Sequence, residues 1–147
     1  MIKYEMTRAN NISWLTIDSS QTIHSVQKQF NDLYSFLKLE FFKQPPVSGA
    51  GNAKNKMITY DMKLKDIQKI VKAGEIKVNT HTRVTELENQ FAKEFGLYVQ
   101  VFRKSGKIWL ETTATDNWTL EQQNGEGKSL SEQLNIKPDN AEDHDIY

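Results

Sequence analysis

The chain has 147 residues, no cysteine and a formal net charge of zero; hydrophobic residues make up 37% of it, and its mean hydropathy is −0.66. This length suits one domain, and the lack of cysteine excludes disulfides, thiolate nucleophiles and cysteine-ligated zinc. No apolar run approaches the roughly 18 residues of a membrane span, and the N-terminus lacks the order of basic and apolar residues that marks an export signal. We therefore expect a soluble, cytoplasmic protein.

Charge is divided unevenly along the chain. Residues 1–110 contain 17 Lys and Arg against 10 Asp and Glu, whereas residues 111–147 contain 2 against 9. Such a division indicates either a basic body that meets an acidic partner, or a solvated lysine-rich face followed by a solubilising tail. We predict a polar N-terminal segment at 1–11, a single domain at 12–122 and an acidic, largely disordered tail at 123–147.

The first half alternates between strand-like and helix-like patterns. Residues 12–17 are rich in β-forming side chains and predict a strand, and the polar residues 18–22 can cap a helix. From 23 to 34 apolar residues recur at helical spacing, and from 37 to 43 they alternate, so a helix and then a second strand are predicted. Residues 44–56 contain two prolines and two glycines without periodicity, which predicts a loop.

The second half begins with a short helix predicted at 63–75, which Gly74 can end. A strand at 75–78 and a polar junction at 79–82 precede a helix that runs to about 95, where Gly96 suits the position after its C-terminus. Two further strands flank Ser105-Gly106, a predicted two-residue hairpin turn that sets Phe102 opposite Trp109.

One apolar pattern occurs twice. The pattern at 17–34 recurs at 78–95 and that at 37–42 recurs at 97–102, with pairs that include Ile17 and Val78, Phe30 and Phe91, and Phe41 and Val101. It predicts two βαβ repeats, each with a parallel strand pair and a right-handed crossover, so that both helices cover one face of the sheet. Convergent patterning of two unrelated segments is the other explanation.

The fold class that follows is α+β, a two-layer sandwich with helices on one face. Its mixed β-sheet comprises a first βαβ repeat at 12–43, a loop and helix at 44–74, and a second repeat with a C-terminal hairpin strand at 75–113. The alternation of the strands then assigns a set of aromatic and lysine side chains to the face that the helices leave uncovered. These candidate partner-binding residues are Trp14, Phe42, Tyr98, Phe102, Lys104 and Trp109.

Three explanations of this face remain open. Residues 1–11, the helix at 63–73 or the segment 114–121 could cover it as a third layer, since large exposed apolar patches are rare in monomers. It could instead be a protein interface, because aromatic residues are enriched at the centres of interfaces. Stacking of single-stranded nucleic acid on the aromatic rings is the third explanation.

Motifs that carry chemistry are absent. His24 and His81 lie near the two junctions between strand and helix, but neither has a metal ligand at suitable spacing, and His144 falls in the predicted tail. No phosphate-binding loop, dinucleotide fingerprint or nucleophile elbow occurs. We therefore expect no metal and no cofactor, and an enzyme that uses the two junctions is only the third hypothesis.

The stretch "FGLYVQVFRKSGKIWLETTATDNWTLEQQN" at 95–124, together with "FLKLEFFK", resembles a family of small uncharacterised proteins from bacteria of the Bacteroidetes group. The resemblance covers most of residues 20–130 and implies a bacterial cytoplasmic setting, without an activity, cofactor or partner. The function expected from the residues is a non-enzymatic interaction, with a protein partner or with a second copy, through the aromatic sheet face. Binding of single-stranded nucleic acid through the same face is the alternative.

Overall fold

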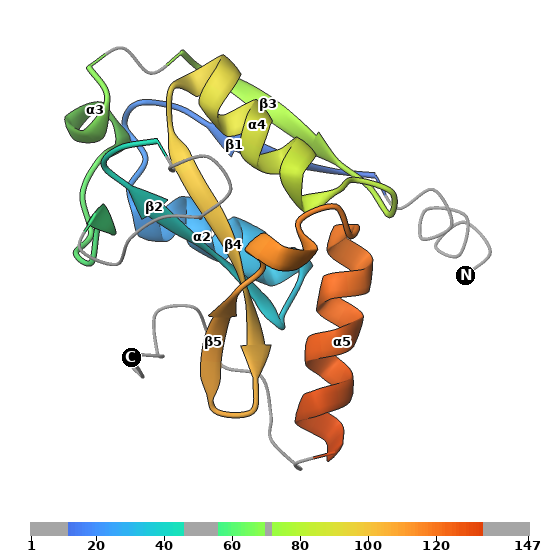
Figure 1. Ribbon diagram of the computed structural model, residues 1–147. Coiled ribbons are helices and arrows are strands. Elements are labelled where there is room, and N and C mark those ends of the chain that lie inside the picture. Colours follow the sequence, from blue (N-terminus) through green and yellow to red (C-terminus); the bar gives the residue numbers. More distant parts are fainter. Residues whose placement is uncertain (1–11, 46–55, 70–71, 134–147) are drawn as a thin grey trace.

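The computed structural model describes residues 12–45, 56–69 and 72–133. Helices and strands alternate in an α+β fold, as the sequence predicts (Figure 1). In chain order the elements are β1 (Ser13–Ile17), α2 (Ile23–Leu33), β2 (Leu37–Phe42), α3 (Leu64–Ile67), β3 (Gly74–Val78), α4 (Val84–Phe95), β4 (Tyr98–Ser105), β5 (Ile108–Glu111), the 3-10 turn η2 (Thr113–Thr115) and α5 (Leu120–Gln133).

The two long amphipathic helices, α2 and α4, begin and end where the sequence indicates. The Thr22 hydroxyl accepts a hydrogen bond from the Ser25 amide at 3.2 Å and so satisfies an amide in the first turn of α2. Gly96 follows α4 in the left-handed conformation, with φ of 65°, and its amide donates to the carbonyls of the last turn. Both predicted helices are confirmed to within two residues.

The strand pairing differs from the prediction. β1 pairs with β3, β2 with β4, and β4 with β5, all antiparallel, so the strands form one two-stranded and one three-stranded sheet. The predicted mixed sheet with parallel pairs is therefore wrong, because β1 and β2, at the two ends of α2, lie in different sheets. Alternation of apolar residues fixes which side chains face the core, but it is the same whether the partner strand is parallel or antiparallel.

β1 and β2 each pair with their counterparts from the other half of the chain, β3 and β4. Leu15 lies opposite Ile76, its equivalent in the repeated pattern, and Glu40 lies opposite its equivalent Gln100. Two equal segments that meet in this way, centre to centre and antiparallel, are related by an approximate two-fold axis. We name the first segment, residues 12–69, unit 1 and the second, residues 72–133, unit 2.

The hydrogen bonds of the two units correspond beyond the strands. Asp18 and Asn79 accept from the amide two residues ahead, at 2.8 Å in both units. The first residue of α3, Leu64, donates to the Gln21 carbonyl, and the first residue of α5, Leu120, donates to the carbonyl of Thr82, the counterpart of Gln21. The correspondence therefore extends to the helix that ends each unit.

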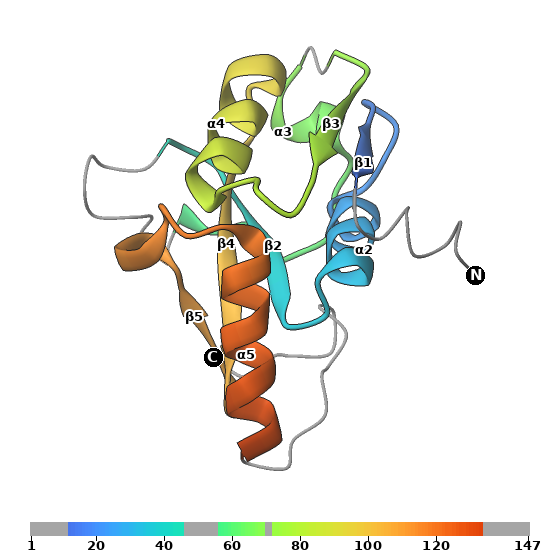
Figure 2. The same ribbon diagram turned by 90° about the vertical axis from the view of Figure 1, so that its right-hand side faces the viewer.

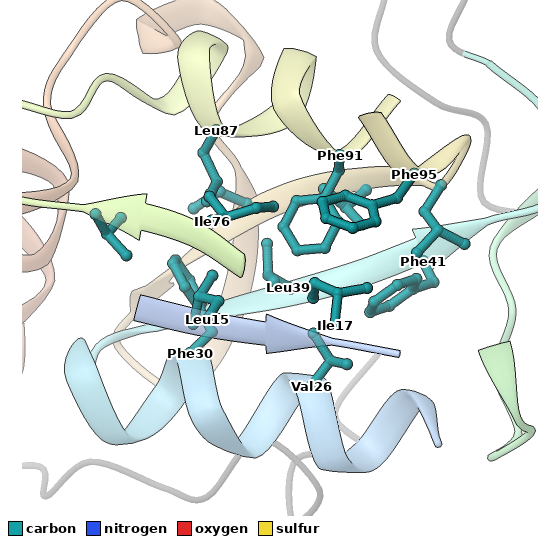
Figure 3. Close-up of a cluster of buried hydrophobic side chains, with 14 of the residues drawn as sticks. Leu15, Ile17, Val26, Phe30, Leu39, Phe41, Ile76, Leu87, Phe91 and Phe95 are labelled. Carbon is teal, nitrogen blue, oxygen red and sulfur yellow. The ribbon is translucent and has the colours of Figure 1, made fainter. Parts of the chain in front are cut away.

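The main hydrophobic core lies between the β1–β3 pair and the β2–β4 pair, with α2 beside β1 and α4 beside β3 (Figure 3). The rings of Phe30 and Phe91, one from each helix, are completely buried in it. Both helices pack on the face of β2 and β4 that carries Leu39 and Val101.

The hairpin between β4 and β5 turns one residue later than predicted. Its loop is Gly106-Lys107, with Ser105 paired to Ile108, because Gly106 supplies the positive φ, 63°, that a two-residue turn requires. Trp109 consequently lies opposite Lys104, and Phe102 lies opposite Glu111. The predicted pairing of Phe102 with Trp109 is wrong.

Two predictions of helix content also change. The helix expected at 63–75 is the single turn α3, which ends at Ile67 because the next residue, Gln68, is extended; residues 70–71 lie outside the described residues. The disordered tail expected from residue 123 is wrong up to Gln133, because this segment forms α5. The polar N-terminal segment 1–11 and residues 134–147 lie outside the described residues.

α5 packs through small and polar side chains instead of an apolar stripe. Thr119 and Gln122 form a capping box: the Gln122 amide donates to the Thr119 hydroxyl at 3.1 Å, and the Thr119 amide donates to Gln122 Oε1 at 2.8 Å. Gly127 is buried where α5 crosses the start of β2 and the end of β4 (Figure 2), and a Cβ there would lie 2.9 Å from the Phe36 Cβ. The helix therefore lies close to the backbone of the sheet.

Candidate functional site

The aromatic face predicted as a binding surface is buried. Phe42, Phe102 and Trp109 are at most 3% exposed and form a second hydrophobic cluster, against which Met57 and Tyr98 pack. The helix expected at 63–73 and the segment 114–121 contribute Leu64 and Leu120 to the main core. Of the three explanations left open, the burial of Phe42, Phe102 and Trp109 agrees with a covered face, and these rings form no open platform for a partner.

The lysines of this face are part of the same interior. The Lys38 Nζ atom lies 2.7 Å from Glu40 Oε2, and the ammonium groups of Lys38 and Lys104 lie 5.1 and 5.2 Å from the centre of the Trp109 ring. Burial lowers the pKa of Lys38 to about 8, against the opposing effect of its Glu40 partner. Buried lysines that pack on an aromatic ring in this way contribute to the interior of the protein. Lys104 is therefore not an exposed contact residue.

Trp14 is separated from the other predicted site residues. It lies on β1, in the two-stranded sheet, and 53% of its surface is exposed. Its neighbour across the strands is Lys77. The structure thus brings together Phe42, Tyr98, Phe102, Lys104 and Trp109 inside the molecule and places Trp14 elsewhere on the surface.

Side chains close the outer edge of β1. Gln29 Oε1 accepts from the Thr16 amide at 2.8 Å, while its Nε2 donates to the Thr16 carbonyl at 2.9 Å. Gln21 Nε2 donates to the same carbonyl at 2.8 Å. Both polar backbone groups of Thr16 are therefore satisfied, which blocks pairing with another strand at this residue.

The edges of β2 and β4 are closed in a similar way. On β2, Gln27 donates to the Leu39 carbonyl at 2.7 Å and Asn31 donates to the Leu37 carbonyl at 2.9 Å. On β4, beyond the end of β5, the Val101 amide donates to Glu88 Oε2 at 2.9 Å and its carbonyl accepts from Thr112 at 2.8 Å. The side chains on β2 come from α2, and on β4 Glu88 comes from α4.

β3 is the exception among these four strands. Both backbone groups of Thr16 point away from β3. In an antiparallel pair, residues directly opposite each other have the same orientation, and this orientation recurs at every second residue, so alternate residues of β3 also turn their amides and carbonyls outward. These are Glu75, opposite Thr16, and Lys77, the counterpart of Thr16 in unit 2. Within residues 12–45, 56–69 and 72–133, no side chain or loop forms a hydrogen bond with the backbone of Lys77.

The counterpart of Gln29 explains the difference. Gln90 occupies the position of Gln29 in unit 2, at the same point of its helix, but its Nε2 donates to Glu94 Oε2 at 3.4 Å. The residue that corresponds to Glu94 in α2 is Leu33, which offers no acceptor to Gln29. Thr82, in the place of Gln21, is too short to reach the strand, and its hydroxyl accepts from the Asn79 amide at 2.9 Å.

An open groove of about 650 Å³ therefore lies along the outer edge of β3, against α4. This volume is within the range of ligand-binding sites. Its lining mixes two lysines and a histidine with two carboxylates, and the rest is amide or hydroxyl; the residues are Lys77, Asn79, His81, Thr82, Glu86, Asn89, Gln90, Lys93 and Glu94. The groove suits a polar ligand and shows no preference for one sign of charge.

The two junction histidines are differently placed. His81 lines the groove, and its amide donates to Asn79 Oδ1 at 2.8 Å. His24 lies in the first turn of α2, with its Nδ1 atom 3.4 Å from Asp61 Oδ2, and is not among the lining residues. The two junctions hence do not converge on one site.

Glu88 is the one carboxyl group of α4 that turns inward, toward β4. Burial raises its pKa to about 7, and the neighbouring charges of Asp116 and Glu111 add to this, against the lowering effect of the hydrogen bond from Val101. Its counterpart in unit 1 is the neutral Gln27. Glu88 does not line the groove.

In the described part of the chain, the acidic and histidine side chains form no group of three that could hold a metal ion. None of its helices is both long enough and apolar enough to cross a bilayer.

Comparison of the chain with protein-family models, with curated proteins and with solved structures finds no match. The groove must therefore be interpreted from its own geometry. Sequence reasoning missed it because the signal is small: a glutamine at the same position in both units, with Glu94 in place of Leu33 and Thr82 in place of Gln21 beside it.

Proposed function

We propose that the protein is a non-enzymatic interaction module that binds a protein partner in the groove between β3 and α4. The observation that carries this proposal is the open outer edge of β3 at Lys77, in a fold where side chains cap the outward backbone groups of Thr16 on β1, Leu39 on β2 and Val101 on β4. An edge with outward amides and carbonyls is a standard site of protein recognition.

The lining of the groove supports binding in preference to catalysis. Among the described residues, the side-chain hydrogen bonds within the lining join Gln90 to Glu94 and Thr82 to Asn79, and none joins a hydroxyl group to His81. A nucleophile paired with a base is thus not assembled there. The carboxylates of Glu86 and Glu94 also make the groove a poor track for a phosphate backbone.

The test uses a variant of unit 2 that is closed in the manner of unit 1. In Thr82→Gln/Glu94→Leu, the new glutamine can accept from the Asn79 amide, as Gln21 does from Asp18, and Gln90 is released to reach Lys77. Both positions are at the surface, so the fold should persist. Slower hydrogen exchange of the Lys77 amide would verify that the edge has closed.

Octapeptides selected from a random phage-displayed library on the wild-type protein serve as the probe. We expect the selected peptides to bind the closed variant at least about tenfold more weakly. The matched control is Gln21→Thr/Leu33→Glu, which makes the reciprocal changes in unit 1 and leaves the groove of unit 2 intact. A selection whose peptides all bind the closed variant as well as the wild type would contradict the proposed function.

A further inference from the structure

A glutamine side chain in unit 1 already makes the contacts that a ligand would make in unit 2. A primary amide carries one carbonyl acceptor and N–H donors, the same pair of groups that a peptide bond presents. In unit 1 the Gln29 amide uses both on one residue, accepting from the Thr16 amide at 2.8 Å and donating to the Thr16 carbonyl at 2.9 Å. Gln29 thus acts as an internal substitute for a neighbouring strand.

The equivalent residue of unit 2, Lys77, presents the same two groups to the groove. Its amide and carbonyl point outward in the register fixed by Thr16, and Lys77 is one of the lining residues. Glu75, two residues earlier, turns the same way, so the edge offers two such positions about 7 Å apart along the strand. The protein therefore presents the outward amides and carbonyls that a short added strand would need.

We infer that the partner contributes a short extended segment that adds to the outer edge of β3 as a further strand, with its peptide groups hydrogen-bonded to the amide and carbonyl of Lys77. This inference rests on the proposed function and specifies the form of the ligand. The segment is polar, because the described residues that line the groove are amides, hydroxyls and charged groups without an apolar side chain among them. Main-chain hydrogen bonds supply affinity in this mode of recognition, and side chains that alternate along the segment supply specificity.

The charged side chains of the edge fit this role. Lys77 and Glu75 are both exposed on β3, and charges on an edge strand discourage indiscriminate pairing with other strands. A segment that carries matching polar groups is accepted, whereas an apolar strand is not.

The experiment takes the peptides selected on the wild-type protein and methylates their backbone nitrogens one at a time, which removes one N–H donor without changing the side chains. Strand addition predicts a periodic result, with a loss of at least about tenfold in affinity at alternate positions and little change between them. It also predicts that the peptide slows hydrogen exchange of the Lys77 amide at least tenfold. The Ile76 amide, whose residue faces β1, is the internal control.

The outcomes separate the two proposals. If binding depends on the groove but every N-methylated peptide binds equally well, or if exchange at Lys77 is unchanged, strand addition is overturned while the proposed function stands. If the wild type forms a concentration-dependent dimer that Thr82→Gln/Glu94→Leu abolishes, the edge belongs to a second copy and the inference of a partner segment is also overturned. Loss of groove-dependent binding altogether would remove both.

Discussion

Unit 1 and unit 2 place Gln29 and Gln90 at the same point of corresponding helices, yet only Gln29 reaches the neighbouring strand. Two substitutions nearby account for this, since Glu94 accepts from Gln90 and Thr82 is shorter than Gln21. The backbone of the two units is otherwise matched residue for residue in the β1–β3 register. A binding groove can therefore arise in a symmetric fold when the side chains that cap a strand edge in one unit do not reach the corresponding edge in the other unit.

The largest expected effect tests whether the two units form one cooperative domain. Phe30→Ala and Phe91→Ala remove corresponding rings that are both fully buried, and each should lower the free energy of unfolding by about 3–5 kcal/mol. Because both strands of unit 1 pair with strands of unit 2, denaturant unfolding of both variants should remain a single transition. A second transition would mean that one unit stays folded after the other has unfolded, which contradicts a single cooperative domain. Leu33→Ala, on the exposed side of α2, is the control.

The next effect concerns the buried carboxyl of Glu88. Its pKa is about 7 in the folded protein and 4.5 ordinarily, so between these pH values the folded state holds a proton that the unfolded chain has released. The contribution of Glu88 to the free energy of unfolding should therefore fall as the pH rises from 4.5 to 7, by about 3 kcal/mol in total.

Glu88→Gln gives unit 2 the residue that unit 1 has at Gln27 and should remove this part of the pH dependence. The measurement is denaturant unfolding at pH 4.5, 6 and 7.5. Glu86→Gln, an exposed carboxylate on the same helix, is the control and should keep the wild-type slope. An unchanged slope in the Glu88 variant would show that this carboxyl is ionised in the folded protein.

A smaller effect tests the long helix that unit 2 has in place of α3. Gly127→Ala should destabilise the protein by about 1–3 kcal/mol, because the added Cβ meets the Phe36 Cβ at 2.9 Å. Gly125→Ala, on the open side of the same helix, should stabilise by up to about 1 kcal/mol through helix propensity. Thermal unfolding of the two variants should therefore shift in opposite directions, and equal shifts would contradict the packing of α5.

The smallest effect sharpens the contrast between the two glutamines. Gln29→Ala removes the cap of the β1 edge and should cost about 1 kcal/mol, with faster hydrogen exchange of the Thr16 amide. Gln90→Ala should change stability by less than about 0.5 kcal/mol, since its one hydrogen bond is long and exposed. Equal costs would mean that Gln90 also supports its strand.

Much of the local structure could be predicted from the sequence, because apolar periodicity and capping residues determine it directly. The helix around Phe30, the helix ended by Gly96 and the strands of both units follow from such signals. Strand partners could not be predicted: the alternation around Leu39 fixes the face of a side chain but not the direction of the neighbouring strand. α5 was missed because its buried residues include Gly127 and Ser131, which form no apolar stripe, although Thr119 and Gln122 were a readable capping box.

The candidate site could be predicted less well. Phe42, Tyr98, Phe102 and Trp109 share a cluster as predicted, whereas Trp14 lies in the other sheet. A face pattern also does not reveal whether another part of the molecule covers it, and Trp109 is 3% exposed. Lys38 and Lys104 appeared to be surface residues because lysine is seldom buried; here an ion pair with Glu40 and the Trp109 ring accompany their burial. The groove depends on which way Gln90 turns, a choice decided by its neighbours in space.

The pairing of the strands of unit 1 with strands of unit 2 has a consequence for synthesis of the protein. When residue 69 leaves the ribosome, β1 and β2 have been made but neither has its partner, and the core cannot close until the chain has reached about residue 105. A nascent chain paused at the midpoint therefore exposes two unpaired strands, and the strands of two such chains on neighbouring ribosomes can pair with each other. Slow translation of the middle of the message would favour entangled pairs of chains, whereas rapid translation would favour the monomer.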